Sequence, residues 1–383
     1  MVAQTRAVLS ASVIMTDYYC SAPFNSVRVD TTDTDQSRYR PCCMYHGKQN
    51  YNNVLEYINS NELFELKQHF LTQSRLPNGC QSCNHQEQQK QISWRQHFNS
   101  KFREQKKITQ LELFPGNVCN LKCFMCSENY STALGAERTK LNFINGYQEI
   151  DNVDACINSI RDLPDLTDIS FIGGEFFLTK KNLEILDLVI EKQLAVRVVT
   201  NGTILLPEHV SRLKQIPRLE LQISIDGIRD SYEFMRYPAK WNVVEKNIHH
   251  IKNDLKHAQL NFNFVVQLLN IQHMIPTVDY ANRLMIPIRL TNLVDPLWLS
   301  WKSLIESEKT LLIELLEKQL TEHKLTTRQQ KTVRDYQQTI QSTLTVPELR
   351  QILQHKIKVI LLHRGISHEK ILQHLGKMDS LLV

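Results

Sequence analysis

Apolar and polar residues follow a different pattern in each of three parts of the 383-residue chain. In the middle part, short runs rich in β-branched and aromatic residues alternate with stretches of helical period. Alternation of this kind predicts β-α units around a parallel sheet, with functional loops at the carboxyl ends of the strands. The six runs that predict strands are 108–114, 167–174, 195–202, 219–227, 261–269 and 286–294.

The parts on either side of this middle part are different. Residues 1–107 are polar and rich in Gln, and their one amphipathic stretch predicts a helix over 54–72. Residues 301–383 have a helical period almost throughout. We therefore expect an α/β protein with an N-terminal module at 1–107, a main domain at 108–300 and a helical C-terminal region at 301–383.

Composition excludes little beyond membrane spans. Hydrophobic residues make up 42% of the chain and charged residues 22%, and no apolar run is long enough to cross a bilayer. The formal net charge of +5 is a mild excess that is compatible with an acidic partner. It does not establish nucleic-acid binding, and it does not exclude it.

The nine cysteines are grouped, and five of them lie in the first 107 residues. Their odd number and tight local spacing favour reduced thiols and metal ligation over structural disulfides. The first 20 residues lack the pattern of a cleaved leader. We expect a cytoplasmic protein.

Three cysteines follow the first predicted strand directly, in the segment CNLKCFMC that contains Cys119, Cys123 and Cys126. Soft thiolates at this spacing can hold one compact iron–sulfur cluster from a single loop. Three local ligands leave one iron of a cubane open to a reactant. A zinc knuckle is the alternative.

This loop, together with the strand ends described below, resembles the radical S-adenosylmethionine (radical SAM) superfamily over most of residues 108–295. The resemblance implies a partial (β/α)6 barrel and a catalytic 4Fe-4S cluster on Cys119, Cys123 and Cys126. It further implies that S-adenosylmethionine binds at the open iron and is cleaved reductively to a 5′-deoxyadenosyl radical, which abstracts hydrogen from a substrate. A one-electron donor such as flavodoxin or ferredoxin is then required.

The same resemblance implies which residues bind the cofactor. Paired glycines let a backbone approach a ligand closely, and a GGE segment at this place in the family meets the amino group of the cofactor. Polar groups at the next strand ends serve its ribose and carboxylate, and Arg236 is a further candidate for the carboxylate, with a surface arginine as the alternative. The implied residues are Met125, Gly173, Gly174, Glu175, Asn201, Ser224, Asp226 and Arg236.

The N-terminal cysteines supply a second set of thiolates, from Cys20, Cys42 or Cys43, Cys80 and Cys83. Four thiolates suit zinc or a four-iron cluster equally. The segment resembles the twitch module, the shortened relative of the SPASM module, and this implies an auxiliary 4Fe-4S cluster on Cys20, Cys42, Cys80 and Cys83. The ninth cysteine, Cys156, lies in a predicted helix and is expected to be a buried apolar residue.

Two functions remain open. The first is a radical SAM enzyme that acts on a peptide or small metabolite, because twitch and SPASM enzymes often modify such substrates. The second is a metal-stapled protein, holding zinc or a structural iron–sulfur cluster, that binds nucleic acid or modifies RNA.

Overall fold

The computed structural model describes residues 17–31, 37–47, 50–88, 92–102 and 107–376. These residues form two compact units. The first unit comprises the chain up to Phe114 together with Asp154–Ile169, and the second comprises Pro115–Val153 and the chain from Ser170 onward. The expected three-part division at 107 and 300 differs from these units and stays a prediction.

In the first unit, three strands lie in the order β2, β1, β3. Strand β1 (Ser26–Thr31) pairs antiparallel with β2 (Ser37–Arg40) and parallel with β3 (Gln110–Leu113). Strands β1 and β2 were not expected from the sequence, because charged residues interrupt their apolar pattern. Arg28 and Asp30 of β1 are nevertheless buried. Arg28 forms ion pairs with Asp30 and Glu112, and Arg40 forms one with Asp30.

The helix expected over 54–72 is two helices, α2 (Val54–Ile58) and α3 (Asn61–Thr72). The chain breaks at Ser60, whose backbone is extended and whose hydroxyl accepts a hydrogen bond from the Leu63 amide at 3.2 Å. This N-cap stabilises the start of a second helix. The apolar period of the sequence does not reveal the break, because both helices keep an apolar face. The other helices of this unit are α1 (Ala22–Asn25), η1 (Asn78–Cys80), α4 (Gln81–Gln88) and α5 (Trp94–Lys101).

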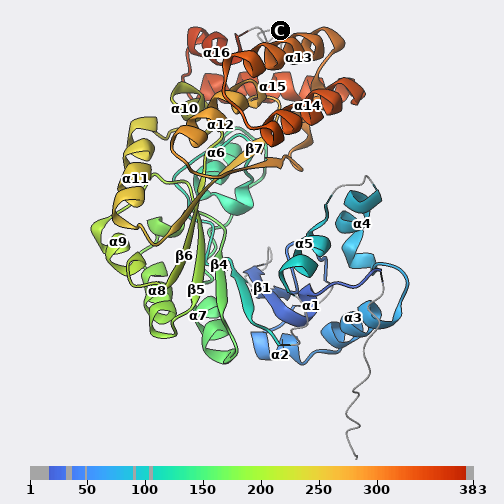
Figure 1. The fold of residues 1–383 in the computed structure, drawn as a ribbon, viewed down its shortest axis with the longest axis vertical. Helices are drawn as coiled ribbons and strands as arrows, with labels where there is room; N and C mark the ends of the chain where they lie inside the picture. The colour runs from blue at the N-terminus through green and yellow to red at the C-terminus, as the bar shows by residue number, and fades with distance from the viewer. Residues whose placement is uncertain (1–16, 32–36, 48–49, 89–91, 103–106, 377–383) are drawn as a thin grey trace, which may run out of the picture. The chain divides into compact units, whose positions relative to one another are not determined.

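The second unit contains four neighbouring parallel strands. They are β5 (Ala195–Thr200), β6 (Arg218–Ser224), β7 (Gln259–Val266) and β8 (Ile288–Asn292). Helices α8 (Asn182–Glu191), α9 (Pro207–Leu213) and α11 (Trp241–Asp254) lie along one side of these strands (Figure 1). Strand β4 (Asp168–Phe171) spans the boundary between the units.

All six strands predicted from the middle of the chain are present as β3 to β8, and the α/β class is confirmed. Cys156 is fully buried in α7 (Val153–Asp162), as expected. The remaining elements between β3 and the C-terminal helices are η2 (Glu128–Tyr130), α6 (Thr132–Lys140), η3 (Phe176–Leu178), α10 (Asp230–Met235), η4 (Ile271–His273), α12 (Met274–Arg283), η5 (Leu297–Leu299) and η6 (Trp301–Ser303).

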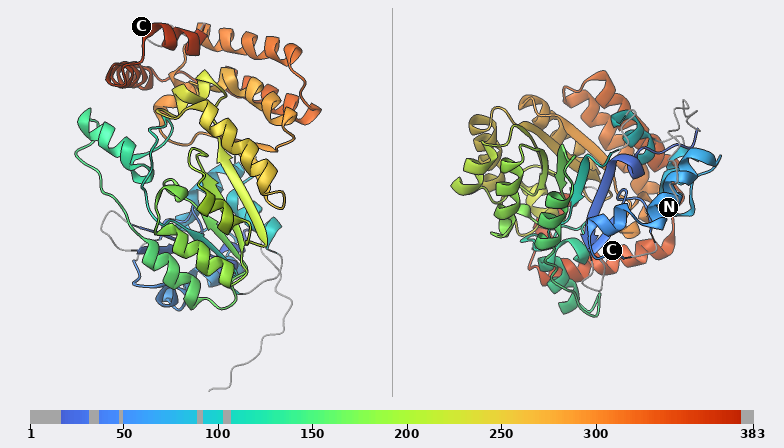
Figure 2. Two further views of the ribbon diagram at one scale, coloured as in Figure 1. Left: turned by 90° about the vertical axis from the view of Figure 1, so that its left-hand side faces the viewer. Right: turned by 90° about the horizontal axis from the view of Figure 1, so that it is seen from below.

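The C-terminal region is helical, as predicted. Its helices are α13 (Glu306–Glu322), α14 (Thr327–Ser342), α15 (Pro347–His363) and α16 (His368–Leu375). Figures 1 and 2 show them gathered beside α10 and α12 at one end of the second unit. Their apolar side chains, among them Leu316 and Ile357, share one core with Phe264 of β7 and Met274 of α12. The region is therefore an integral part of this unit.

Among the described residues, no helix combines the length and the hydropathy that a membrane crossing needs.

Candidate active site

The loop of the three cysteines is held by backbone hydrogen bonds to the segment that follows α10. The amide of Lys122 donates to the Tyr237 carbonyl at 2.7 Å, and the amide of Phe124 donates to the Met235 carbonyl at 3.3 Å. These two bonds form a short backbone ladder between residues 122–124 and residues 235–237. The second segment therefore helps to hold Cys119, Cys123 and Cys126 in place.

The three thiols influence one another's ionisation. The pKa of Cys123 is raised to about 12, chiefly by burial, with Arg236 lowering it and the neighbouring Cys126 and Cys119 adding to the rise. Burial raises the pKa of Cys126 to about 11, again with a contribution from Cys119. No three His, Cys, Asp or Glu side chains in the described part of the chain are arranged as a ready metal site. As a donor set, the three thiols of this single loop fit a four-iron cluster that keeps one iron free of protein ligands.

The GGE segment packs against the start of this loop. The amide of Gly174 donates to the Gly116 carbonyl at 2.9 Å, and that of Glu175 donates to the Val118 carbonyl at 2.8 Å. A Cβ at position 174 would lie 2.3 Å from the Val118 carbonyl oxygen, and Gly173 has a φ of 122°. Only glycine allows this close approach and this backbone conformation. Because residue 174 has no side chain, the GGE segment can lie directly against the Val118 backbone and form a cradle beside the cysteine loop.

The Glu175 carboxylate is buried and accepts three hydrogen bonds. Its donors are the Thr200 hydroxyl at 2.7 Å, the Asn201 amide at 2.6 Å and the Phe177 amide at 3.3 Å. Burial nevertheless raises its pKa, because desolvation opposes the charge more than these donors favour it. The carboxylate therefore ties the end of β4 to the end of β5, and it is the backbone of Glu175 that meets the cysteine loop.

Asn201 connects that strand end to the first cysteine. Its side-chain amide donates to the Asn120 side-chain oxygen at 2.9 Å and approaches the Cys119 sulfur at 4.0 Å. Its carbonyl accepts the Tyr232 hydroxyl at 3.0 Å. Sequence reasoning missed Asn120, Thr200 and Tyr232, because a single polar residue in a loop, strand or helix carries no signal of its partner.

Asp226 and Arg236, both expected to meet the cofactor, form a buried ion pair with each other at 2.5 Å. Asp226 also accepts the Val265 amide at 2.7 Å, and a guanidinium nitrogen of Arg236 lies 3.7 Å from the Cys123 sulfur. The alternative of a surface arginine is wrong, since Arg236 is 8% exposed. A guanidinium beside Cys123 stabilises negative charge on that sulfur.

The predicted site residues therefore fall into two connected groups. One joins Glu175 and Asn201 to Cys119, and the other joins Asp226 and Arg236 to Cys123. Met125 and Ser224 are each half-buried. In the described structure, neither side chain has a hydrogen bond to these groups.

The N-terminal cysteines also form a group, within the first unit. The pKa of Cys20 is raised to about 12, chiefly by burial, and Cys80 and Cys83 contribute to the rise. Burial also raises the pKa of Cys42, with contributions from Cys43, Cys20 and Cys83. The pKa of Cys43 is raised to about 11, chiefly by burial. Its charged neighbours differ from those of Cys42 and are Glu112, Arg28 and Arg40.

Comparison with known proteins identifies the class. Residues 113–281 match the model of the Radical SAM superfamily. The chain therefore contains a radical SAM domain, and the cofactors that this superfamily implies are a 4Fe-4S cluster and S-adenosylmethionine. A search of curated protein sequences found no match.

Solved structures with a similar fold include anSMEcpe with bound AdoMet, which is 18% identical over 57% of this chain and 61% of that chain, with a TM-score of 0.42. Streptococcus suis SuiB bound to precursor peptide SuiA is 15% identical over 66% of this chain and 54% of that chain, also with a TM-score of 0.42. The radical S-adenosylmethionine methyltransferase TsrM from Kitasatospora setae is 11% identical over 48% and 35% of the two chains, with a TM-score of 0.35. The chain thus spans about three fifths or less of each of these structures.

Proposed function

We propose that the chain is an enzyme that cleaves S-adenosylmethionine reductively and uses the resulting radical to abstract hydrogen from a peptide. The observation that carries the proposal is that Cys119, Cys123 and Cys126 lie on one loop inside the matched domain. When bound, the reduced 4Fe-4S cluster supplies the electron that splits the sulfonium into methionine and a 5′-deoxyadenosyl radical.

The surrounding residues hold and orient these groups. Gly173 and Gly174 leave backbone space for the amino group of the cofactor, beside the loop that the Glu175 amide anchors. Asn201 and Ser224 offer polar groups to its ribose and carboxylate, and the half-buried Met125 offers an apolar contact for the adenine.

Asp226 and Arg236 have a different role in this proposal. Because each already neutralises the other, we assign them to the support of Cys123 and to shielding its charge, with contact to the cofactor as a second role. A buried pair of this kind is costly to break from one side, because the remaining charge is left uncompensated. It therefore keeps the guanidinium fixed beside the sulfur.

The same proposal includes an auxiliary 4Fe-4S cluster on Cys20, Cys42, Cys80 and Cys83. The mutual influence of these four thiols on their pKa values supports it. The separate, charged surroundings of Cys43 support Cys42 as the ligand of the adjacent pair. The resemblance to the twitch module favours iron over zinc.

A peptide is the proposed substrate because enzymes with this module often modify peptides, and SuiB was solved with its precursor peptide. Reduction of the catalytic cluster requires a one-electron donor, and we propose flavodoxin or ferredoxin.

The test is anaerobic reconstitution with iron and sulfide, followed by dithionite and S-adenosylmethionine. We expect 5′-deoxyadenosine from the wild type and from Cys156→Ala, whose thiol lies in a helix outside both groups, and none from Cys119→Ala. Equal product from wild type and Cys119→Ala would remove the proposal. Zinc at both thiol groups after anaerobic purification, with salt-sensitive RNA binding, would favour the metal-stapled nucleic-acid protein instead.

A further inference from the structure

An arginine from the far end of the chain lies behind the cysteine loop. Arg364 ends helix α15 and its side chain is 1% exposed. Its guanidinium donates to both carboxylate oxygens of Glu137 in α6, at 3.0 and 2.7 Å. It also donates to the Lys122 carbonyl, inside the cysteine loop, at 2.6 Å. One buried side chain thus connects α15, α6 and the loop.

The faces of the same guanidinium meet two aromatic rings. Its central carbon lies 4.7 Å from the centroid of Phe124 and 5.1 Å from that of Tyr237. Phe124 directly follows Cys123, and the Tyr237 carbonyl accepts the Lys122 amide. Arg364 therefore contacts both segments of the short ladder that holds the loop. The edge of its guanidinium donates hydrogen bonds, and the faces make cation–π contacts.

We propose that Arg364 is a positioning residue for Cys119, Cys123 and Cys126, so that the C-terminal helical region completes the active site. The inference rests on the proposed function for what the loop holds. It goes beyond it because Arg364 lies outside the matched residues 113–281. The C-terminal helices then order the loop that presents the thiols.

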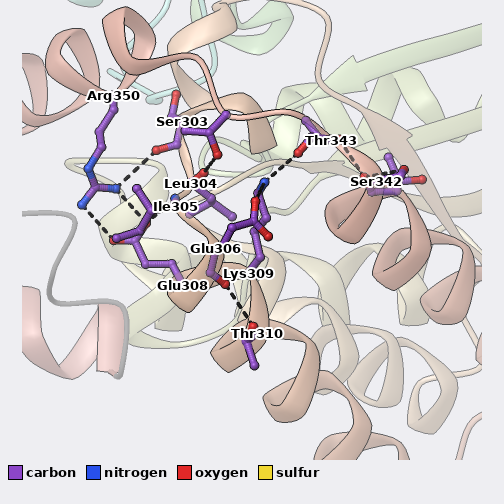
Figure 3. Close-up of polar contacts among 12 residues, drawn as sticks. Ser303, Leu304, Ile305, Glu306, Glu308, Lys309, Thr310, Ser342, Thr343 and Arg350 are labelled. Atoms are coloured by element: carbon purple, nitrogen blue, oxygen red, sulfur yellow. Dashed lines mark hydrogen bonds and ion pairs between the residues drawn. The ribbon is translucent and has the colours of Figure 1, made fainter.

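Helix α15 is itself braced within the C-terminal region. Near its start, Arg350 pairs with both carboxylate oxygens of the buried Glu308, at 2.7 and 3.0 Å (Figure 3). The buried ammonium of Lys309 donates to the Thr343 carbonyl at 2.6 Å, at the end of α14. The Arg350 pair lies at the opposite end of α15 from Arg364, and its partner Glu308 is not part of the cysteine loop.

The geometry requires arginine. A planar guanidinium can donate to two carboxylate oxygens and a carbonyl while it stacks on rings, whereas an ammonium is a point charge without a face. Arg364→Lys keeps the charge opposite Glu137 but loses the fork and the stacking. This substitution therefore isolates the contacts that reach the loop.

The first experiment measures hydrogen exchange in the metal-free protein, so it does not depend on cluster binding. We expect Arg364→Lys to speed exchange of the Lys122 and Phe124 amides at least tenfold. Arg350→Lys is the matched control, since it alters a similar bidentate pair on the same helix whose partners, Glu308 and Ser303, lie outside the loop. It should leave the exchange of the loop unchanged.

The second experiment measures the electron paramagnetic resonance spectrum and midpoint potential of the reconstituted cluster. Arg364→Lys and Glu137→Gln should shift both, and Arg350→Lys should shift neither. Glu137→Gln keeps the stacking on Phe124, so its exchange change should be smaller than that of Arg364→Lys.

Three results would overturn the inference: unchanged loop exchange in Arg364→Lys, the same increase in Arg350→Lys, or an increase spread evenly over the second unit. If the wild type binds no cluster, the proposed function fails, but the exchange result still decides the role of Arg364.

Discussion

At the scale of single residues, Gly174 lies against backbone atoms that leave no room for a side chain. A Cβ there would meet the Val118 carbonyl oxygen at 2.3 Å and the Asn117 carbonyl carbon at 2.7 Å, and both belong to the backbone. Backbone cannot move aside as a flexible side chain can. Gly174→Ala should therefore displace the start of the cysteine loop and cost about 1–3 kcal/mol of unfolding free energy. Denaturant unfolding and iron content after reconstitution measure the two effects.

Gly146 provides the matched control, because a Cβ there would have no neighbour within 4 Å. Gly146→Ala should change the unfolding free energy by less than about 0.5 kcal/mol and leave the iron content unaltered. If Gly174→Ala binds as much iron as Gly146→Ala, the cradle around the loop is not needed for the cluster.

The adjacent pair Cys42 and Cys43 allows a sharp test of the auxiliary site. Besides burial, Cys43, Cys20 and Cys83 raise the pKa of Cys42, whereas the charged neighbours that shift the pKa of Cys43 are Glu112, Arg28 and Arg40. We expect reconstituted wild type to hold about eight irons per chain, and Cys42→Ser to hold about four. Cys43→Ser should keep the wild-type number. Equal losses in both variants, or none in either, would contradict the assignment of Cys42.

Thiol ionisation also predicts how metal binding depends on pH. Burial raises the pKa of Cys123 to about 12 and that of Cys126 to about 11, so both are protonated at neutral pH in the metal-free chain. A metal must displace these protons, and its apparent affinity should rise with pH. Titration of the metal-free protein with Co²⁺ between pH 7 and 9 should show a rising affinity that Cys123→Ser makes less steep. A flat profile would show that the thiolates are already formed.

At the scale of elements, helix α16 is fixed by a neutral histidine. His374 is 5% exposed, its ring stacks on Phe234 at 3.8 Å, and its Nε2 lies 2.8 Å from the Leu269 carbonyl. A carbonyl only accepts, so Nε2 carries the proton and Nδ1 is bare. Burial and the nearby His273 hold the pKa of His374 well below its usual range. The charged form is thus incompatible with the docked helix.

The direction of the pH effect follows from this shift. Above about pH 6.5 the ring is neutral in the folded and the unfolded chain, and its contribution to stability is complete. Below that pH the histidine binds a proton in the unfolded chain but not in the folded chain. Stability then falls by up to about 1.4 kcal/mol per pH unit for each such histidine.

His374→Gln should therefore lower the unfolding free energy at pH 7.5 but make its decline toward pH 5.5 less steep. The exposed His257 provides the control, and His257→Gln should leave both the level and the slope unchanged. Urea unfolding at a series of pH values measures both. A slope for His374→Gln equal to that of the wild type would show that this ring takes up its proton in the folded chain as well.

At the scale of the whole molecule, the sequence predicted what depends on local pattern. The six middle strands and the helical C-terminal region follow from apolar period, and Cys119, Cys123 and Cys126 follow from spacing. What it missed depends on ion-pair partners that only the folded structure brings together. Strand β1 carries Arg28 at a buried position because Asp30 and Glu112 neutralise it.

Arg364 was missed for the same reason, and Arg236 was predicted as a cofactor-binding candidate but not as half of a buried ion pair. Their buried partners, Asp226 and Glu137, stand 10 and 227 residues away in the chain. A lone arginine resembles a surface residue until the fold supplies its partner, because burial of an unpaired charge is too costly to expect. The residues proposed for cofactor binding followed from the family resemblance, whereas their contacts with one another did not.

The shared core gives a last prediction about how far the domain can be shortened. Apolar side chains of α13 to α15, such as Leu316, Leu353 and Ile357, pack in one core with Phe264 and Met274 of the matched domain. A chain that ends at Ser300 would expose those two residues and their neighbours to water. We expect it to aggregate or to bind the dye ANS strongly.

Supplying residues 301–383 as a separate chain tests whether the loss is one of packing. Each buried apolar side chain contributes about 1.5–3 kcal/mol when it is covered, so the two pieces should associate and the dye signal should fall. The Arg364→Lys form of the added piece should restore packing as well as the wild-type piece does, yet leave the Lys122 and Phe124 amides in fast exchange. A shortened chain that stays monomeric, binds no dye and protects these amides would show that the C-terminal helices serve neither the core nor the loop.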